Sequence, residues 1–271
     1  MSAAQRQLVR PLPQVAAANQ GVAMNLSGIS DKSLLGKVLR FPLRLIPPQT
    51  VLPIMQGRLK GKKWIAGSGN HGCWLGSYEY AKRIVFERTV RENSVVFDVG
   101  AHVGFYTLLA SVLVGPRGRV FAFEPFPANL VYLQEHLRLN RIENVTVVEA
   151  AVSDKCGTAF FDEGPSSSMG HISPNGRLQV ETVAIDELVA KGELPLPDFL
   201  KMDIEGAEAL ALSGAKSVLA QSHPTMFVAT HGSRIHQECC RLLHSLDYEL
   251  EPIDGKSLES SSEILATWHA G

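Results

Sequence analysis

The segment VVFDVGAHVGFYT, from Val95 to Thr107, constrains the fold of this chain more than any other. Its pattern is typical of a buried strand, a turn that holds Gly100 and Gly104, and a helix. A glycine turn lets the backbone approach a ligand closely, and the start of the helix offers unpaired N–H groups. The segment therefore predicts a ligand-binding strand–turn–helix unit.

Strand and helix patterns alternate from this unit to the end of the chain. The strand patterns are SVVFDV, RVFAFE, VTVVEA, PDFLKMDI and PTMFVATH. Helical patterns stand between them, including PANLVYLQEHLRLN, one helix through GAEALALSGAKSVLA, and 233–246. This alternation predicts an α/β fold, an open and mainly parallel sheet with helices on both faces. Ligands of such sheets bind beyond the carboxyl ends of the strands.

The chain divides into an arm and one large domain. Residues 1–56 lack strand pattern and contain Pro47-Pro48, so we expect an N-terminal arm, followed by a domain over 57–271. The basic, amphipathic run LLGKVLRFPLRLIPP in this arm favours packing on the domain or on a second subunit over a membrane surface, which predicts a possible homodimer. Two strands flank a polar loop within 157–184, an insert that has the length of a substrate lid.

Composition excludes several classes of partner. A formal net charge of −1 gives no clustered basic face for nucleic acid. No run of eighteen apolar residues is present, so we expect no membrane span. The four cysteines form no CxxC pair, which favours a reducing, cytoplasmic compartment.

The glycine turn differs from the dinucleotide fingerprint GxGxxG because its middle glycine is missing. Asp98 would repel a phosphate there and attract an ammonium group. Glu124 ends the next strand, where a carboxylate can accept bonds from both ribose hydroxyls. Asp154, after the third strand, can accept a bond from an adenine amino group. An ammonium group, a ribose and an adenine in this order describe S-adenosylmethionine.

The chain resembles the FkbM-type S-adenosylmethionine-dependent methyltransferases from about Gly57 onward. The motifs that carry the resemblance are HGCWLGSYE, DVGAHVGFYT, FEPFP, AVSD, KMDIEGAE and EILA. It implies a Rossmann-like, seven-stranded, mostly parallel sheet whose last strand is antiparallel. Members are mostly O-methyltransferases that act on hydroxyl groups of sugars and other secondary metabolites.

The resemblance also implies a set of cofactor-binding residues. It places residues around the methionine part, places Glu124 at the ribose, and places the turn from Ala151 to Asp154 at the adenine. Tyr78 and Glu79 could close over the cofactor or meet the acceptor. The expected set is Tyr78, Glu79, Asp98, Gly100, Ala101, Gly104, Tyr106, Thr107, Glu124, Pro125, Ala151, Ser153, Asp154 and Asp203.

Three residues at the ends of later strands are the catalytic candidates. Methyl transfer to a hydroxyl requires an aligned oxygen and a group that accepts its proton. Asp203 and Glu205 follow the fourth strand, and they could bind the hydroxyl, act as base or cap the next helix. His231 ends the fifth strand and has the ordinary pKa of a base that works near neutrality. The family often has Glu two residues before this histidine; Ala229 stands there instead, so Asp203 is expected to assist His231.

Three alternatives remain open from the sequence. A nicotinamide-dependent oxidoreductase would also use Glu124, but the missing glycine and Asp98 disfavour it. A non-catalytic scaffold of the same fold would not need the cofactor residues. Asp203, Glu205 and His231 could hold a divalent cation, although no spacing signature supports one and no metal is expected.

Overall fold

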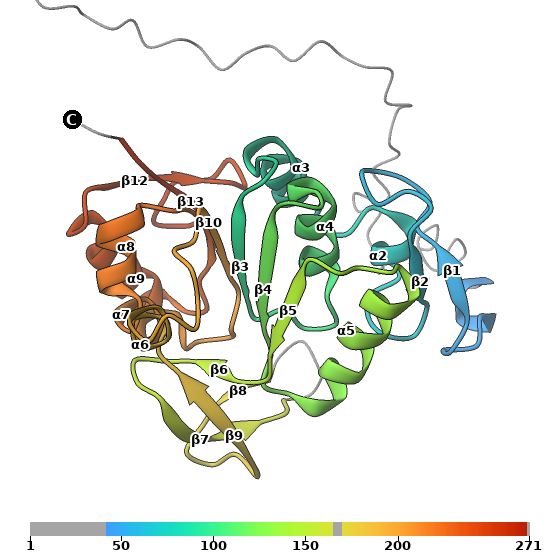
Figure 1. Ribbon diagram of the computed structural model, residues 1–271, viewed down its shortest axis with the longest axis horizontal. Helices are drawn as coiled ribbons and strands as arrows, with labels where there is room; N and C mark the ends of the chain where they lie inside the picture. Colours follow the sequence, from blue (N-terminus) through green and yellow to red (C-terminus); the bar gives the residue numbers. More distant parts are fainter. Residues whose placement is uncertain (1–41, 165–169, 270–271) are drawn as a thin grey trace, which may run out of the picture.

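A seven-stranded sheet forms the centre of the molecule. The computed structural model describes residues 42–164 and 170–269. The strands in spatial order are β12 (Tyr248–Pro252), β13 (Glu263–Trp268), β11 (Thr225–Ala229), β10 (Phe199–Met202), β3 (Val95–Val99), β4 (Arg119–Phe123) and β5 (Val145–Val148) (Figure 1). The run from β11 to β5 is parallel, whereas β13 is antiparallel to both of its neighbours. The predicted open, mainly parallel α/β sheet is confirmed.

Helices cover both faces of this sheet. One face packs against α3 (Tyr80–Thr89) and α4 (Phe105–Val114). The helices on the other face are α6 (Ile185–Ala190), α7 (Glu208–Ser213), α8 (Lys216–Ser222) and α9 (Ser233–His244). Because side chains alternate along a strand, Val96 packs with the first set and its neighbour Phe97 with the second. Both faces are buried, which explains the nearly continuous apolar pattern of the strands.

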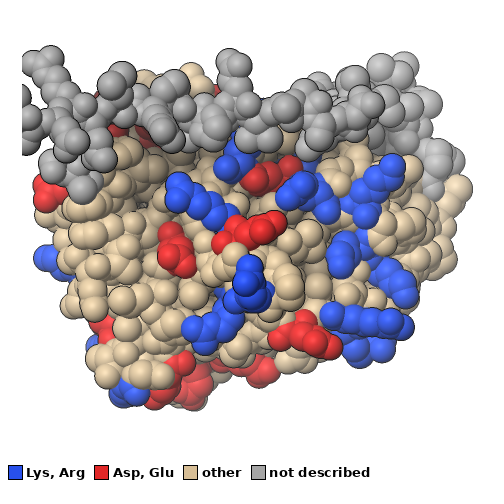
Figure 2. Space-filling view, turned by 45° about the horizontal axis from the view of Figure 1, so that its top comes forward, with Lys and Arg blue, Asp and Glu red and all other residues tan. Residues whose placement is uncertain are grey.

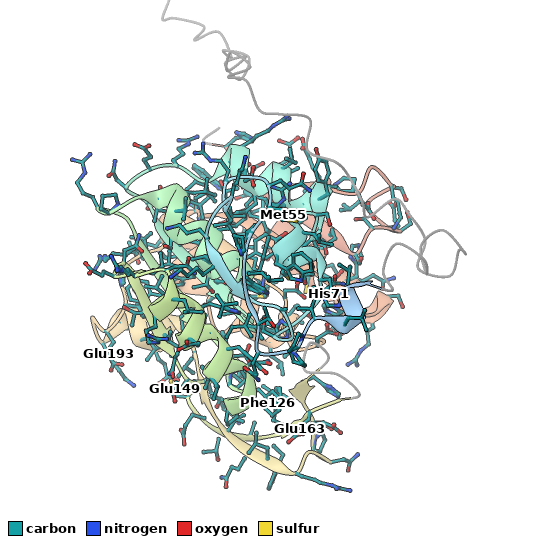
Figure 3. All side chains as sticks on the ribbon, turned by 90° about the vertical axis from the view of Figure 1, so that its right-hand side faces the viewer. Met55, His71, Phe126, Glu149, Glu163 and Glu193 are labelled. Carbon is teal, nitrogen blue, oxygen red and sulfur yellow. The ribbon has the colours of Figure 1, made fainter. Side chains whose placement is uncertain are left out.

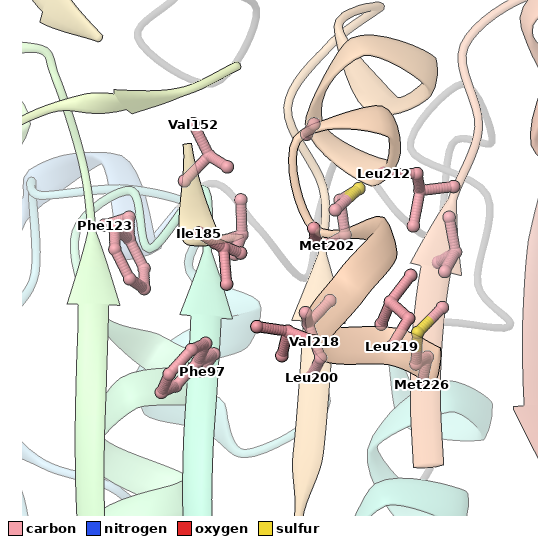
Figure 4. Close-up of a cluster of buried hydrophobic side chains, with 14 of the residues drawn as sticks. Phe97, Phe123, Val152, Ile185, Leu200, Met202, Leu212, Val218, Leu219 and Met226 are labelled. Atoms are coloured by element: carbon pink, nitrogen blue, oxygen red, sulfur yellow. The ribbon is translucent and has the colours of Figure 1, made fainter. Parts of the chain in front are cut away.

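The core between the sheet and the second set of helices is built from aliphatic and aromatic side chains. Phe97 and Phe123 pack at 5.7 Å between ring centroids. Leu200, Met202 and Met226 extend this layer along the neighbouring strands toward the helices (Figure 4). These side chains lie below the carboxyl edge of the sheet, so they hold the strands whose ends carry the candidate site.

The predicted insert forms a small sheet of its own. Its strands, in spatial order, are β6 (Ala151–Val152), β9 (Leu178–Val183), β7 (Gly157–Asp162) and β8 (His171–Ile172). This sheet projects from the end of the molecule where the parallel strands terminate (Figure 1). Phe126, at the start of α5 (Pro127–Leu139), faces it, and its ring stacks on Phe161 at 5.9 Å between centroids (Figure 3).

One expected helix is two helices. The sequence GAEALALSGAKSVLA predicted a single helix, but α7 ends at Ser213 and α8 begins at Lys216. A side chain at Gly214, between them, would collide with the carbonyl oxygen of Ser153. The Ser153 backbone therefore occupies the space that a side chain at position 214 of a continuous helix would need.

The described part of the expected N-terminal arm begins with a short 3-10 helix, η2 (Pro42–Leu45), and a hairpin. Strand β1 (Val51–Pro53) pairs antiparallel with β2 (Lys63–Ile65), so this hairpin crosses the expected boundary at residue 56. The hairpin contacts α5, where Trp64 stacks on His136 at 3.8 Å between ring centroids. Residues 1–41, on which most of the arm and the dimer expectation fall, lie outside the described residues.

Candidate active site

Two adjoining cavities lie at the carboxyl edge of the parallel strands. The larger cavity has a volume of about 560 Å³, and the smaller one about 60 Å³. Four residues line both: Gly100, His102, Asp203 and Glu205. The glycine turn after β3 and the loop after β10 therefore form the boundary between the cavities, at the place where the sequence predicted a ligand.

Gly100 explains why the glycine turn needs its first glycine. The residue has a φ of +78°, and a side chain there would collide with the carbonyl oxygen of Asp203. Gly104, with a φ of +92°, is different: it lines neither cavity, and a Cβ there would lie 2.5 Å from Cδ1 of Leu133 in α5. Gly104 is therefore a position where the turn packs closely against α5. This differs from the sequence expectation, which placed Gly104 at the wall of the cofactor site.

His136 of α5 links the glycine turn to the N-terminal hairpin. Its Nε2 accepts a bond from Ile65 N–H at 3.1 Å, and its Nδ1 donates to the carbonyl of Val103 at 2.8 Å. Burial lowers the pKa of this histidine to about 4, so it remains neutral and keeps this pattern near neutrality. The hairpin, α5 and the turn are thereby fixed to one another.

Glu124 lies in the smaller cavity as a buried carboxylate. Its Oε2 accepts a 2.7 Å bond from His102 N–H. Its Oε1 accepts bonds from Phe126 N–H at 3.0 Å and Asn129 Nδ2 at 3.1 Å. A carboxylate has about four lone-pair sites, so Glu124 retains capacity for a ligand hydroxyl. It joins the glycine turn to the start of α5 and faces the cavity.

The adenine end expected from the sequence is only partly in the smaller cavity. Pro125 and Ala151 line it, and Phe161 from the insert closes it. Ser153 and Asp154 line neither cavity, and Ser153 Oγ bonds Asp154 Oδ1 at 3.2 Å. The turn that carries them packs toward Gly214, which directs both away from the cavity. The insert contributes Phe161, Gly170, His171 and Ile172 to the smaller cavity, and His171 lies close enough to Glu205 to influence its pKa. Residues 165–169, in the middle of the loop expected to act as a substrate lid, lie outside the described residues.

Asp98 is not where an ammonium group could reach it. The residue is 1% exposed and lines neither cavity. Its Oδ2 accepts a 2.6 Å bond from Thr107 Oγ1, and its Oδ1 lies 3.1 Å from Nζ of Lys201. Lys201 is its neighbour in the ladder between β10 and β3. Asp98 and Thr107 therefore hold Lys201 and α4 in place, a correction to their expected contact with the cofactor.

A second buried lysine collects three carboxylates beside the larger cavity. Lys82 of α3 is 4% exposed, and its Nζ lies 3.3 Å from Glu79, 3.2 Å from Asp203 and 3.0 Å from Glu263. These carboxylates come from three separate segments of the chain. Their ion pairs with Lys82 bring Glu79, one of the expected cofactor residues, to the cavity wall.

Tyr106 separates the two lysines. The centroid of its ring lies 5.6 Å from Lys82 Nζ and 5.5 Å from Lys201 Nζ, within cation–π range. The residue lines the larger cavity together with Tyr78 and Ala101, as expected. Its hydroxyl is buried beside Glu79, and burial together with the Glu79 carboxylate raises the pKa of Tyr106 well above its ordinary value.

His231 is held by a carboxylate that the sequence did not single out. Its Nδ1 lies 2.7 Å from Oε1 of Glu208, a fully buried residue at the start of α7. The hydrogen bond to Glu208 is the main reason that the pKa of His231 is raised, against the opposing effect of burial. Glu208, not Asp203, orients the imidazole, which corrects the sequence expectation.

The other ring nitrogen of His231 faces two more carboxylates. Nε2 lies 3.8 Å from Asp203 Oδ1 and 3.5 Å from Glu205 Oε2, beyond direct hydrogen bonds. Burial alone would raise the pKa of Asp203, but Lys82 and Lys201 outweigh it and hold this pKa at about 2. Burial raises the pKa of Glu205. Asp203 is thus an ionised hydrogen-bond acceptor and too weak a base for a hydroxyl.

The ligand atoms of Asp203, Glu205 and His231 all lie within 4.8 Å of one another, which is compatible with a metal ion. This trio is the same one that the sequence offered for a divalent cation. A cation there would occupy the lone pair of Nε2 and remove the histidine as a base. The two arrangements are therefore mutually exclusive.

Sequence patterns missed five charged or aromatic residues of the site. Lys82 and Lys201 lie inside amphipathic or strand patterns, where a lysine usually faces solvent. Glu208 stands in the KMDIEGAE motif but resembles a helix-start acid. The missed residues are Lys82, Phe161, Lys201, Glu208 and Glu263. Three of them are within salt-bridge distance of an expected site residue, so pairing of opposite charges was the available signal.

Acidic and basic side chains are interspersed on the face shown in Figure 2, outside the part that grey atoms cover. Among the described residues, no helix has the length and apolar character that a membrane crossing requires.

The fold defines a Rossmann-like protein with two adjoining cavities at the carboxyl edge of its sheet. Residues 98–250 match the family model described as the Methyltransferase FkbM domain. The chain belongs to this family, and the resemblance found in the sequence is confirmed. Membership places it among methyltransferases and not among nicotinamide-dependent oxidoreductases.

Individual relatives are more distant. The chain is 30% identical over 164 residues to the hexuronic acid methyltransferase AglP of Haloferax volcanii, covering 59% of this chain and 65% of AglP. It is 25% identical over 165 residues to the 2-O-methyltransferase NoeI of Sinorhizobium fredii, covering 53% and 65%. The chain thus spans just under two thirds of the length of these relatives.

A solved structure supports the fold. The methyltransferase FkbM of Methylobacillus flagellatus KT superposes with a TM-score of 0.51 at 22% identity, covering 72% of this chain and 50% of that one. At this identity the similarity supports the Rossmann-like methyltransferase fold and nothing finer.

Proposed function

We propose that the protein is an S-adenosylmethionine-dependent O-methyltransferase that acts on a hydroxyl group of a sugar or another secondary metabolite. The observation that carries the proposal is the His231–Glu208 pair at 2.7 Å, facing a cavity that adjoins the buried carboxylate of Glu124. Family membership and the printed names of AglP and NoeI support the reaction class.

The residues of the two cavities fit this cofactor. Glu124 retains acceptor capacity for a ribose hydroxyl, and Gly100, which lines both cavities, carries no side chain that would block the passage between them. Tyr106 and Glu79 offer a hydroxyl and a carboxylate at the wall of the larger cavity. When bound, S-adenosylmethionine supplies an electrophilic methyl group on a sulfonium.

His231 acts as the general base in this proposal. Because Nδ1 donates to Glu208, the lone pair of the neutral ring is on Nε2 and faces the cavity. Nε2 accepts the proton that the acceptor hydroxyl loses, and Glu208 stabilises the imidazolium that results. The raised pKa of His231 strengthens it as a base, although a larger fraction is then protonated at neutral pH.

Asp203 and Glu205 position the acceptor. Their carboxylate oxygens lie 3.8 Å and 3.5 Å from Nε2, so they can accept hydrogen bonds from neighbouring hydroxyls of a polyol. The acceptor in this proposal is a small molecule, and the compartment is the reducing cytoplasm, which the four free cysteines support. We also propose that the protein forms a homodimer through its N-terminal arm.

The experiment is incubation of the protein with S-adenosylmethionine and a panel of glycosides and polyols. Mass spectrometry should detect products that carry one additional methyl group. Glu124→Ala and His231→Ala, purified in parallel, should fail to form them at the wild-type rate. The proposal would be contradicted if the products carry the methyl group only on nitrogen, or if both variants form the products at the wild-type rate.

A further inference from the structure

Basic and acidic residues are distributed unevenly along the chain. Between Lys32 and Tyr78 the sequence contains eight lysines and arginines and no aspartate or glutamate, although the net charge of the whole chain is only −1. The described part of this stretch includes the hairpin of β1 and β2, which lies at one edge of the molecule (Figure 1). The hairpin is therefore a basic element of a chain whose other residues carry a net negative charge.

Four basic side chains of the hairpin are available to a partner. Arg58 and Lys60, in the connection between the strands, and Lys63, at the start of β2, are exposed, and Lys62 is partly exposed. None of the four forms a salt bridge within the described part of the chain. Positive charge that the protein does not neutralise itself attracts an anionic partner.

The strands of the hairpin present an outer face that is both apolar and basic. Side chains alternate along β1, so Val51 and Met55 point away from the core, with exposed fractions of 44% and 59%. Pro53 lies between them on the same face and pairs with Lys63 of β2, which brings the lysine onto this face. Figure 3 views this side of the molecule, with Met55 labelled. One face of the hairpin thus combines aliphatic side chains with a lysine.

A third exposed apolar side chain lies directly before the hairpin. Leu45 of η2 is 72% exposed, whereas Leu43 and Ile46 pack against the core. The run that was expected to pack on the domain therefore does so in part and leaves Leu45 at the surface. Leu45, Val51 and Met55 are three of the seven large hydrophobic side chains that are exposed among the described residues. Exposed apolar groups are thus concentrated where the basic residues are.

This combination favours an anionic lipid surface over the other anionic or apolar partners. Aliphatic side chains set among lysines and arginines are typical of surfaces that enter the headgroup region of a membrane. Single-stranded nucleic acid would be bound with exposed aromatic side chains on which bases stack, but Trp64, the aromatic residue of the hairpin, is fully buried. A second copy of the chain, docked face to face, would bring like charges together.

We propose that the outer face of the hairpin, together with Leu45, docks the protein on the surface of an anionic lipid bilayer. The lysines and arginines attract the headgroups, and Leu45, Val51 and Met55 enter the boundary between headgroups and acyl chains. Such contact is peripheral and requires no helix that crosses the membrane. The inference is independent of the methyl-transfer reaction, and it requires the proposed homodimer to use another part of the arm.

Vesicle sedimentation with the full chain tests the inference. The wild type should bind phosphatidylcholine vesicles that contain about one third phosphatidylglycerol, should not bind pure phosphatidylcholine vesicles, and should dissociate at about 1 M salt. The double substitution Lys60→Gln and Lys63→Gln should lower the partition coefficient roughly tenfold or more, because each basic residue near the surface adds to the attraction. Met55→Ser should lower it roughly threefold, because it removes apolar surface from the interface.

The matched controls alter side chains that are exposed elsewhere on the molecule. They are the double substitution Lys155→Gln and Lys216→Gln, and Val131→Ser, and each should bind vesicles like the wild type. Wild-type protein that does not bind anionic vesicles, or that binds neutral ones equally well, would overturn the inference, as would equal losses in the control and hairpin variants. So would hairpin variants that keep vesicle binding but lose binding to a single-stranded RNA, or a dimer that Met55→Ser dissociates in sedimentation velocity.

Discussion

Nδ1 of His231 lies 2.7 Å from Oε1 of Glu208, and Glu208 is fully buried. Because this hydrogen bond fixes Nδ1, the other ring nitrogen, Nε2, faces the cavity in a defined orientation. The pair joins the end of β11 to the start of α7, so the proposed base is placed by the fold and not by a flexible loop.

Replacement of His231 by Ala should lower the methyl-transfer rate by about a hundredfold to ten-thousandfold, because a positioned base contributes about that much. The affinity for S-adenosylhomocysteine should be nearly unchanged, since Nε2 of His231 faces the proposed acceptor position beside Asp203 and Glu205. Steady-state rates and calorimetry measure the two quantities. Dialysis against a chelator should leave wild-type activity unchanged; loss of activity that a divalent cation restores would favour the metal arrangement over the base.

Replacement of Glu208 by Gln should shift the pH dependence of the rate. The neutral form of His231 is the active one, so activity is present above its pKa and lost as the pH falls below it. Glu208 is the largest cause of the raised pKa, so the transition of the variant should lie at lower pH than that of the wild type. Glu249→Gln, which alters an exposed carboxylate of β12, should keep the wild-type profile. An unshifted transition in Glu208→Gln would mean that the profile reports another group.

Asp203 should make folding stability depend on pH. Its folded-state pKa of about 2 is below the ordinary value of 3.8, so its contribution is present above pH 3.8 and lost as the pH falls toward 2. By linkage the full contribution is about 2 kcal/mol, of which roughly 1 kcal/mol is lost between pH 6 and pH 3. Urea unfolding of the wild type and Asp203→Asn at these two pH values measures it. A stability difference that is the same at both would show that Lys82 does not depress this pKa.

Gly104→Ala should destabilise the fold rather than block the cofactor selectively. Gly104 and Gly192 both have a positive φ, +92° and +74°, but only at Gly104 would a Cβ meet another group, the Leu133 side chain. Gly192→Ala should therefore cost about 1 kcal/mol from backbone strain, and Gly104→Ala at least twice that. Thermal unfolding compares the two. Equal melting temperatures, with binding lost only in Gly104→Ala, would restore Gly104 as part of the cofactor site.

The sequence was sufficient for the β–turn–α unit and for the residues at strand ends, because alternation and glycine spacing are local properties. Gly100, Glu124 and His231 follow from such patterns, and the structure places each at a cavity. Pairings between distant segments do not follow. Asp98 has the position of an ammonium ligand, yet the register between β10 and β3 brings Lys201 against it.

The contact between Glu208 and His231 could not be predicted for the same reason. It depends on how α7 packs beside the end of β11, and the break at Gly214 that shortens α7 is itself set by the backbone of Ser153. A local pattern contains no information on that packing. Opposite charges in segments that the fold brings together are the signal that a sequence does offer, and Lys82, Lys201 and Glu208 each pair with an expected site residue.

Calorimetric titration of the purified protein with S-adenosylhomocysteine tests the central claim most directly. The account predicts binding at one site, no binding of a nicotinamide dinucleotide, and a loss of roughly 2–4 kcal/mol, about 30- to 1000-fold, in Glu124→Ala. Glu124→Gln keeps the shape and one carbonyl oxygen, so it should lose less while remaining folded. No binding of S-adenosylhomocysteine, or equal affinity in a folded Glu124→Ala variant, would contradict the account.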